Sequence, residues 1–203
     1  MDQKEDHKRT DQTVVEKVLR GDTKAFSVII KNTEGLVAQI IFKMIPNHDD
    51  RKDIAQDVYL KVFQKLASFK FEAKLSTWIG QITYNTCVNF LEKKKLPLVD
   101  IATLEQETDE EGADRWNNLL NPFDNDIEKY LINKEFSQIL AVGIDRLPPL
   151  YKTLITLYHT EELSCAEIAQ IVQLPEGTVK SYLFRARRAL RDQVVRIYNK
   201  GML

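Results

Sequence analysis

The sequence predicts an all-α protein made of two small helical domains joined by a flexible acidic linker. Apolar residues recur at spacings of three and four and almost never alternate with polar ones, which is the period of a helix with one buried face. Only 7 Gly and 6 Pro interrupt the 203 residues, and apolar residues make up 43% of them, as in globular chains. The third observation is the distribution of charge along the chain.

The formal net charge of −1 hides a strong segregation. Residues 1–99 carry +4, residues 100–128 carry −9, and residues 129–203 carry +4. The middle block also lacks helical periodicity, which indicates a linker; a surface loop of one large domain is the alternative. Basic, periodic sequence on both sides favours two domains. We therefore expect a disordered tail over 1–11, a first helical domain over 12–96, the linker over 97–128 and a helix-turn-helix domain over 129–203.

Several classes of protein are disfavoured. The charged start MDQKEDHKRTDQ has no apolar core, and the longest uncharged run, Leu75–Leu91, is too polar to span a bilayer. Cys87 and Cys165 lie far apart, and the three histidines share no metal-ligand spacing with them. We expect a soluble, cytoplasmic protein with no metal or cofactor, and the sequence argues against a hydrolase or metal enzyme.

Cap and stop signals divide the chain into helices. The first is expected over 12–20, with Asp11 as its cap and Gly21 as its stop. Asp22 begins a second helix, which gives way near Gly35 to a third that ends before Pro46. Further helices are predicted over 50–66, 76–94, 126–146, 149–159, 165–172 and 176–199.

The most specific local pattern is a helix-turn-helix over Leu163–Leu190. Ser164 and Glu167 are spaced as a capping box, in which each side chain satisfies a free amide at the start of a helix. Ala169 is small where a second helix must cross closely. The break before Pro175 allows a helix to restart, because proline is tolerated in the first turn.

The restarted helix has two faces. One is an apolar stripe at spacings of three and four, and the other gathers polar and basic residues together with Phe184. From Lys180 to Lys200 there are seven Lys or Arg and one acid, Asp192. Such a helix fits the major groove of DNA; a solvated basic helix without a ligand is the alternative. The stripe comprises Val179, Leu183, Ala186, Leu190, Val194 and Ile197, and the polar face comprises Lys180, Ser181, Phe184, Arg185 and Arg188.

In the first domain, aromatic residues alternate with lysines between Phe69 and Lys95. Aromatic rings stack on unpaired bases and lysines hold phosphates, which is the chemistry of single-strand binding. We expect Phe69 and Lys70 to lie in an exposed loop, with Lys74 close by, and Trp78 to pack in the core.

On the predicted helix over 50–66, Asp53, Gln56 and Asp57 lie together, away from the apolar stripe. Taken alone they indicate a solvated face.

These features, in this order, resemble the extracytoplasmic-function sigma factors of bacterial RNA polymerase. The resemblance implies a first domain for polymerase and the −10 element, a second for the −35 element, and only a linker between them. It is carried by Gly21-Asp22-x-x-Ala25-Phe26, Asp50-x-x-Asp53-Ile-Ala-Gln56-Asp57-Val-Tyr-Leu-Lys-Val-Phe, Ser68-Phe69-Lys70, Ser76-Thr77-Trp78-Ile79, Ile82-x-x-Asn85-Thr86, Leu147-Pro148-Pro149 and the helix-turn-helix.

The resemblance also implies roles for individual residues. The polymerase-clamp surface falls on Asp53, Gln56 and Asp57, and the pocket for a flipped-out −10 base falls on Phe69 and Asn85. An aromatic ring and an amide suit such a pocket, because they repay the cost of unstacking a base. We place Lys70 and Lys74 beside this pocket. The −35 contacts are assigned to Thr178, Lys180, Ser181, Phe184, Arg185, Arg187 and Arg188.

The sequence departs from the family pattern at three positions. Phe71 stands where glycine is common, Gln81 precedes Ile82 where an arginine is usual, and Gln173 replaces the glycine of the helix-turn-helix turn. A left-handed conformation at Gln173 would cost about 1 kcal/mol.

We expect a non-enzymatic initiation factor whose partners are core RNA polymerase, promoter DNA and an anti-sigma factor. The acidic linker is expected to follow a basic channel of the polymerase, where its charge resembles that of RNA. The alternative is a two-domain helix-turn-helix regulator that binds DNA without polymerase. The absence of receiver-like alternation of strands and helices counts against it.

Overall fold

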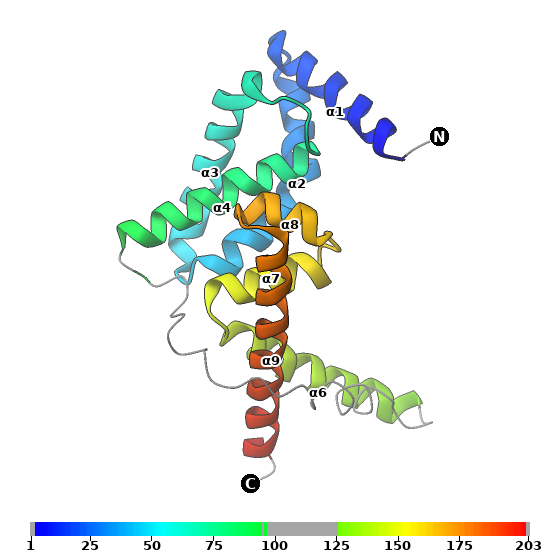
Figure 1. Cartoon of the computed structure of the whole chain (residues 1–203), viewed down its shortest axis with the longest axis vertical. Coiled ribbons are helices and arrows are strands. Elements are labelled where there is room, and N and C mark those ends of the chain that lie inside the picture. Colours follow the sequence, from blue (N-terminus) through cyan, green and yellow to red (C-terminus); the bar gives the residue numbers. More distant parts are fainter. Residues whose placement is uncertain (1–2, 95, 97–125, 202–203) are drawn as a thin grey trace.

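The computed structural model describes residues 3–94, 96 and 126–201, and every regular element among them is a helix. An all-α fold with two helical parts is confirmed (Figure 1). The N-terminal unit consists of α1 (Gln3–Leu19), α2 (Thr23–Met44), α3 (His48–Lys65), a 3-10 turn (Leu66–Ser68) and α4 (Leu75–Lys93). The C-terminal unit consists of α6 (Asp126–Asp145), α7 (Pro149–His159), α8 (Cys165–Val172) and α9 (Glu176–Gly201).

Helix α2 is the centre of the N-terminal unit and packs against α1, α3 and α4. The expected break near Gly35 is wrong, because the helix runs through it without interruption. Leu36, Val37 and Ile40 continue the buried face beyond the glycine, and their burial outweighs the roughly 1 kcal/mol that glycine costs in a helix. Among the described helices, α2 alone is long and apolar enough to cross a membrane by length and composition; here eight of its residues are buried.

The start of the chain also differs from expectation. The predicted tail over 1–11 is helical from Gln3 onward, and Asp11 lies inside α1 instead of capping it. The Asp11 Oδ2 atom accepts a hydrogen bond from the backbone amide of Leu75, 2.9 Å away, at the first turn of α4. No side chain of the residue before α4 satisfies that turn, so the distant carboxylate takes the place of a local cap.

The predicted linker lies mostly outside the described residues, which resume at Asp126. The helix predicted over 126–146 is confirmed by α6, which spans Asp126–Asp145, so residues 126–128, at the end of the predicted linker, belong to this helix. Within the C-terminal unit, α6 and α9 pack side by side where Gly143 faces Leu190 and Val194.

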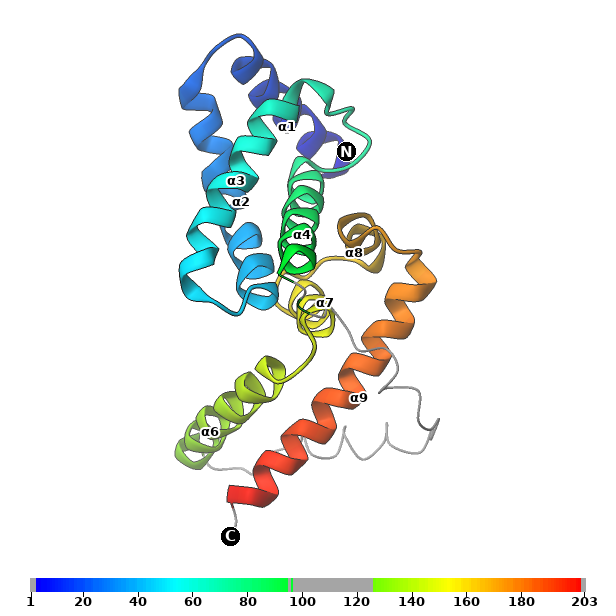
Figure 2. The ribbon, with the colours of Figure 1, turned by 90° about the vertical axis from the view of Figure 1, so that its left-hand side faces the viewer.

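The two units are packed against each other. Helix α8 lies across α4, and α7 lies against α2, while α6 and the end of α9 extend away (Figure 2). The two helices approach closely at Gly80 on α4, where a Cβ would lie 3.1 Å from the side chain of Ile171 on α8. The ion pair Lys43–Asp145, 3.5 Å long, also joins the units.

Candidate nucleic-acid interface

The helix-turn-helix is built by local capping. Ser164 Oγ accepts a hydrogen bond from the Glu167 amide at 3.2 Å, and the Glu167 carboxylate accepts one from the Ser164 amide at 3.0 Å. Gln173 ends α8 in the left-handed conformation, with φ of 56°. The predicted capping box is confirmed, and Gln173 adopts the left-handed conformation that glycine favours. Together they fix the angle at which α9 leaves α8.

Helix α9 has the two faces that its periodicity predicts. Val179, Leu183 and Ala186 are buried against the rest of the C-terminal unit. The opposite side is exposed, and we call it the recognition face. The Phe184 ring is 61% exposed, an apolar surface that lies in water without a protein partner to cover it. The recognition face comprises Lys180, Ser181, Phe184 and Arg185, all of which are exposed.

Neighbouring groups hold the recognition face in place. Lys180 forms an ion pair with Glu176 at 2.7 Å, and Ser181 Oγ donates to the Gly177 carbonyl at 3.0 Å. Both contacts lie within α9, so they break without disturbing the fold when a ligand competes for the side chains. The surface is preformed, and Lys180 and Ser181 can exchange these contacts for contacts with a ligand.

The three other predicted −35 residues lie in different surroundings. Thr178 is half-buried at the start of α9, and Arg188 is half-buried further along it. The Arg187 guanidinium lies 4.9 Å from the ring centre of Tyr158, and its Nε donates to His159 Nε2 at 3.3 Å. Partial burial and the nearby Arg187 charge lower the pKa of His159, which keeps the imidazole neutral and able to accept this bond.

The aromatic loop of the N-terminal unit differs from expectation. The Phe69 side chain is only 7% exposed, although its loop lies on the surface. Trp78 packs against the core, as expected, and is half-buried there. The centre of the Phe69 ring lies 4.7 Å from that of Phe71 and 5.1 Å from that of Trp78. Phe71 adopts φ of 57°, which turns the loop back and brings the rings together. Glycine adopts this positive φ without strain, which agrees with the glycine that the resemblance leads us to expect at this position.

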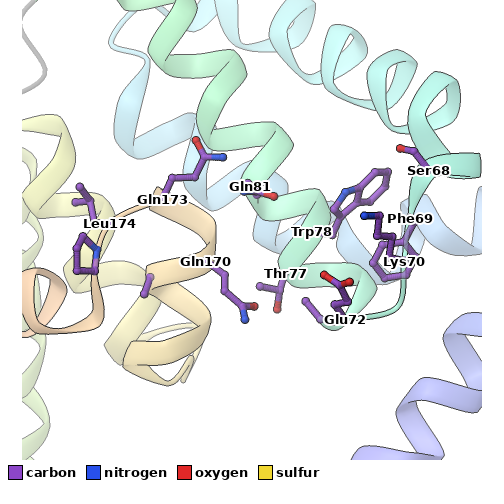
Figure 3. A pocket seen from close by; sticks show the side chains of 13 residues that line it. Ser68, Phe69, Lys70, Glu72, Thr77, Trp78, Gln81, Gln170, Gln173 and Leu174 are labelled. Carbon is purple, nitrogen blue, oxygen red and sulfur yellow. The ribbon is translucent and has the colours of Figure 1, made fainter.

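A cavity of about 690 Å³ lies beside this loop, and we call it the loop cavity. One wall comes from the N-terminal unit, with Phe69, Lys70 and Trp78, and the other comes from Gln170 and Gln173 at the end of α8 (Figure 3). An aromatic floor with amide groups along its sides suits a flat, polar-edged group such as a nucleobase.

The remaining −10 candidates lie near the cavity but do not line it. Lys74 forms an ion pair with Glu167 of α8 at 2.8 Å. Asn85 is half-buried on α4, two turns beyond Trp78. The structure therefore brings Phe69 and Lys70 together, and leaves Asn85 outside the described cavity.

The polymerase candidates form an exposed surface on α3. Asp53, Gln56 and Asp57 are all exposed, and we call them the acidic face. A groove of about 240 Å³ between α3 and α4 is lined by Asp50, Asp53 and Asp57, whereas Gln56 lies outside it. Asp57 pairs with Lys61 at 2.7 Å, and Asp50 with Lys94 at 2.8 Å.

Sequence reasoning missed two apolar residues beside the acidic face. Leu60 is 56% exposed and Phe63 is 51% exposed, and Phe63 meets Phe26 edge-to-face at 5.1 Å. The sequence places two apolar stripes on this helix at a spacing of four, one of Ile54, Val58, Val62 and Leu66 and one of Tyr59 and Phe63. Leu60 lies outside both stripes, and this position could have indicated that it is exposed. Phe63 belongs to a stripe with Tyr59, so its periodicity predicts burial that the structure does not show.

Among the residues that the structure describes, no group of three or more His, Cys, Asp or Glu side chains is placed to hold a metal ion. Burial raises the pKa of the Cys87 thiol to about 12, which keeps it protonated.

The two helical units carry a helix-turn-helix with an exposed basic face and an aromatic, lysine-bearing loop, a combination typical of proteins that bind nucleic acid. Residues 29–96 match sigma-70 region 2, and residues 137–190 match sigma-70 region 4. The chain is 34% identical over 187 residues to the ECF RNA polymerase sigma-E factor of Escherichia coli K12, covering 91% of this chain and 94% of that protein. It is 32% identical to that of Haemophilus influenzae, covering 91% and 95%. The chain belongs to the ECF RNA polymerase sigma factors and serves promoter-specific transcription initiation.

Two solved structures share the fold. CnrH, in complex with the cytosolic domain of CnrY, has a TM-score of 0.59 at 16% identity, over 90% of this chain and 95% of that one. The sigma factor RpoE of Bartonella quintana, in complex with the anti-sigma factor NepR, has a TM-score of 0.58 at 20% identity, over 85% and 98%.

Proposed function

We propose that this sigma factor divides promoter binding between its two units. The recognition face of α9 reads the −35 element in the major groove, with Thr178, Arg187 and Arg188 contributing at its edges. The observation that carries this proposal is the exposure of Lys180, Ser181, Phe184 and Arg185 on one side of a helix whose other side is buried. Arg and Lys donate to guanine edges and phosphates, and Phe184 suits a thymine methyl group.

The N-terminal unit is proposed to hold the melted −10 strand. Phe69 and Trp78 offer aromatic surfaces to an unpaired base, and Lys70 lines the same cavity, where it can neutralise a phosphate. Lys74 is proposed to do the same when it leaves its ion pair with Glu167. Asn85 is assigned to the base edge from the family resemblance. Phe69 must become more exposed than its present 7% to perform this role.

The acidic face on α3 is proposed to bind core polymerase. Asp53, Gln56 and Asp57 are exposed together on a rigid helix, which suits a basic partner surface. An anti-sigma factor is a second proposed partner, because the RpoE structure cited above, which shares the fold, is a complex with the anti-sigma factor NepR. We place the protein in the cytoplasm and assign it no catalytic chemistry of its own.

The test is run-off transcription with purified core polymerase and a library of genomic promoters. We expect transcripts only when this chain is added, and a shared −35 and −10 motif upstream of their start sites. Duplex binding that requires no polymerase, together with no transcripts, would instead identify a conventional helix-turn-helix regulator.

A further inference from the structure

The end of helix α7 brings two side chains to Arg187 of α9. His159 is the last residue of α7 and lies exposed where that helix packs against α9. Its Nε2 atom is 3.3 Å from the Nε atom of Arg187, and the Arg187 guanidinium lies 4.9 Å from the ring centre of Tyr158. The rings of Tyr158 and His159 meet edge-to-face, with 4.9 Å between their centres. The three side chains form one cluster, which we call the edge cluster.

Helical spacing puts the edge cluster next to the recognition face. Arg187 follows Lys180 by seven residues and Phe184 by three, so these three side chains project from one side of α9. All three are exposed. His159 joins that side from a different helix. When a recognition helix enters a major groove, side chains at its edge meet the phosphates that border the groove, and the edge cluster is placed for such a contact.

In the structure without DNA, the histidine of the edge cluster is neutral. The His159 Nε2 atom accepts the hydrogen bond from Arg187, and an imidazole nitrogen accepts only when it carries no proton. Burial and the Arg187 charge both lower the pKa of His159. Helix α7 also packs against α2 and α8, but the charges nearby on those helices and in the following loop add no shift to this pKa. These charged residues are Lys24, Lys31, Glu34 and Lys43 of α2, Glu161 and Glu162 of the loop, and Glu167 of α8.

A phosphate at the edge cluster reverses the electrostatic balance. Its negative charge offsets the repulsion between the Arg187 guanidinium and a protonated imidazole, so His159 can take up a proton from solvent at Nε2. His159 Nε2 and Arg187 Nε then both donate to phosphate oxygens, and two charge-assisted bonds replace the single bond between the side chains. Because the two nitrogen atoms lie only 3.3 Å apart, one phosphate can accept from both.

We infer that His159 and Arg187 form a phosphate-binding site at the edge of the recognition face, and that this site takes up one proton when duplex DNA binds. Since the bound state holds more protons than the free state, affinity for DNA rises as the pH falls through the range in which histidine titrates, around pH 6.5. The inference rests on the proposed placement of Arg187 at the DNA, and the experiment separates the two claims.

The test measures binding of the full chain to a mixed-sequence DNA duplex by fluorescence anisotropy, at about pH 7.5 and about pH 5.5 and at constant ionic strength. This probe is sufficient because a phosphate contact does not depend on sequence. We expect the gain in affinity at the lower pH to be about fivefold larger in the wild type than in His159→Gln, the factor for two unit charges about 4 Å apart in water. His48→Gln is the matched control, because His48 is exposed on α3, and it should keep the wild-type response.

Two further measurements distinguish a phosphate contact from a structural role of His159. At about pH 5.5, the slope of log affinity against log salt concentration should be steeper in the wild type than in His159→Gln by about 0.9, the value for one additional neutralised phosphate. His159→Lys carries a positive charge at both pH values. It should bind the duplex more tightly than the wild type at about pH 7.5 and lose the additional gain at about pH 5.5.

The outcomes separate this inference from the proposed function. A pH response in the wild type equal to or smaller than that of His159→Gln, or equal salt slopes, overturns the proton-linked site. Arg187→Ala tests the placement of Arg187 and should weaken duplex binding at both pH values. Wild-type affinity in Arg187→Ala would remove Arg187 from the DNA contact and the edge cluster with it. Weaker binding by Arg187→Ala, with no effect of the His159 variants on pH response or salt slope, would leave the proposed function standing and refute proton uptake.

Discussion

The carboxylate of Asp11 on α1 accepts a hydrogen bond from the backbone amide of Leu75, 64 residues further along the chain and 2.9 Å away. The first helix thereby caps the helix that carries Trp78, Gly80 and Asn85. Since Leu75 directly follows the loop of Phe69 and Lys70, this bond also fixes one end of that loop.

Replacement of Asp11 by Ala should therefore destabilise the protein. We expect a loss of about 1 kcal/mol in the free energy of unfolding, the usual cost of losing a side-chain cap. Urea unfolding followed by circular dichroism measures it. Asp11→Asn keeps an acceptor oxygen and should lose less than half as much; equal losses would mean that the hydrogen bond contributes little.

Lys180→Ala combined with Arg185→Ala should abolish −35-dependent transcription and leave polymerase binding intact. A specific DNA contact contributes about 1–3 kcal/mol, so we expect promoter affinity to fall at least about tenfold, with a weaker salt dependence. Footprinting and run-off transcription measure the two effects. Arg146→Ala with Arg196→Ala removes the same charge from exposed positions outside the recognition face, and an equal loss in that control would point to net charge alone.

Asp53→Ala combined with Asp57→Ala should weaken binding to core polymerase and leave DNA binding by α9 intact. Loss of two carboxylates from the acidic face is expected to weaken binding to core polymerase about tenfold or more, as for charge pairs at other interfaces. Native gels or light scattering of the holoenzyme report it, and duplex binding by the variant should be unchanged. Asp49→Ala, an exposed acid on the same helix, is the matched control. Normal holoenzyme formation by the double variant would refute the assignment of this face.

Asn85→Ala should impair promoter opening without affecting polymerase binding, because it removes an amide proposed to bond a base edge. Asn85→Asp, which has the same shape but lacks the amide donor, should be equally defective. Permanganate reactivity of unpaired thymines in the −10 region measures opening. Asn32→Ala, on the exposed side of α2, serves as the control. Opening at the wild-type rate in both Asn85 variants would remove this residue from the site.

The contact between His159 and Arg187 should make stability depend on pH. Burial and Arg187 place the pKa of His159 below 6.5 in the folded state, so the unfolded chain binds the proton more tightly. The contribution of neutral His159 to the free energy of unfolding is fully present above pH 6.5. It is lost as the pH falls from 6.5 through the pKa of His159 in the folded state. We expect the free energy of unfolding to fall less between pH 7.5 and 5.5 in His159→Gln than in the wild type. Identical slopes would show that this histidine is not the cause.

Much of the C-terminal unit is predictable from the sequence because its signals are local. The Ser164–Glu167 box, the turn at Gln173 and the apolar stripe from Val179 onward each depend on residues within one or two helical turns. Capping bonds and helical periodicity arise within such distances, so the predicted and observed helices agree closely.

Three features of the N-terminal unit depend on distant partners, and sequence reasoning misjudged them. Helix α2 continues through Gly35 because neighbouring helices bury both of its halves. Asp11 caps α4 instead of its own helix. Phe69 is buried because Phe71 and Trp78 fold over it. None of these contacts has a signature at a fixed spacing along the chain.

The sequence by itself determined the helical class, the helix-turn-helix, the recognition face of α9 and the acidic face of α3, because periodicity decides which side of a helix is apolar. Only the tertiary structure decided that α8 packs on α4 at Gly80 and pairs Glu167 with Lys74. That contact depends on how two surfaces fit together, and complementarity of shape and charge between separate helices appears only when both are placed in space.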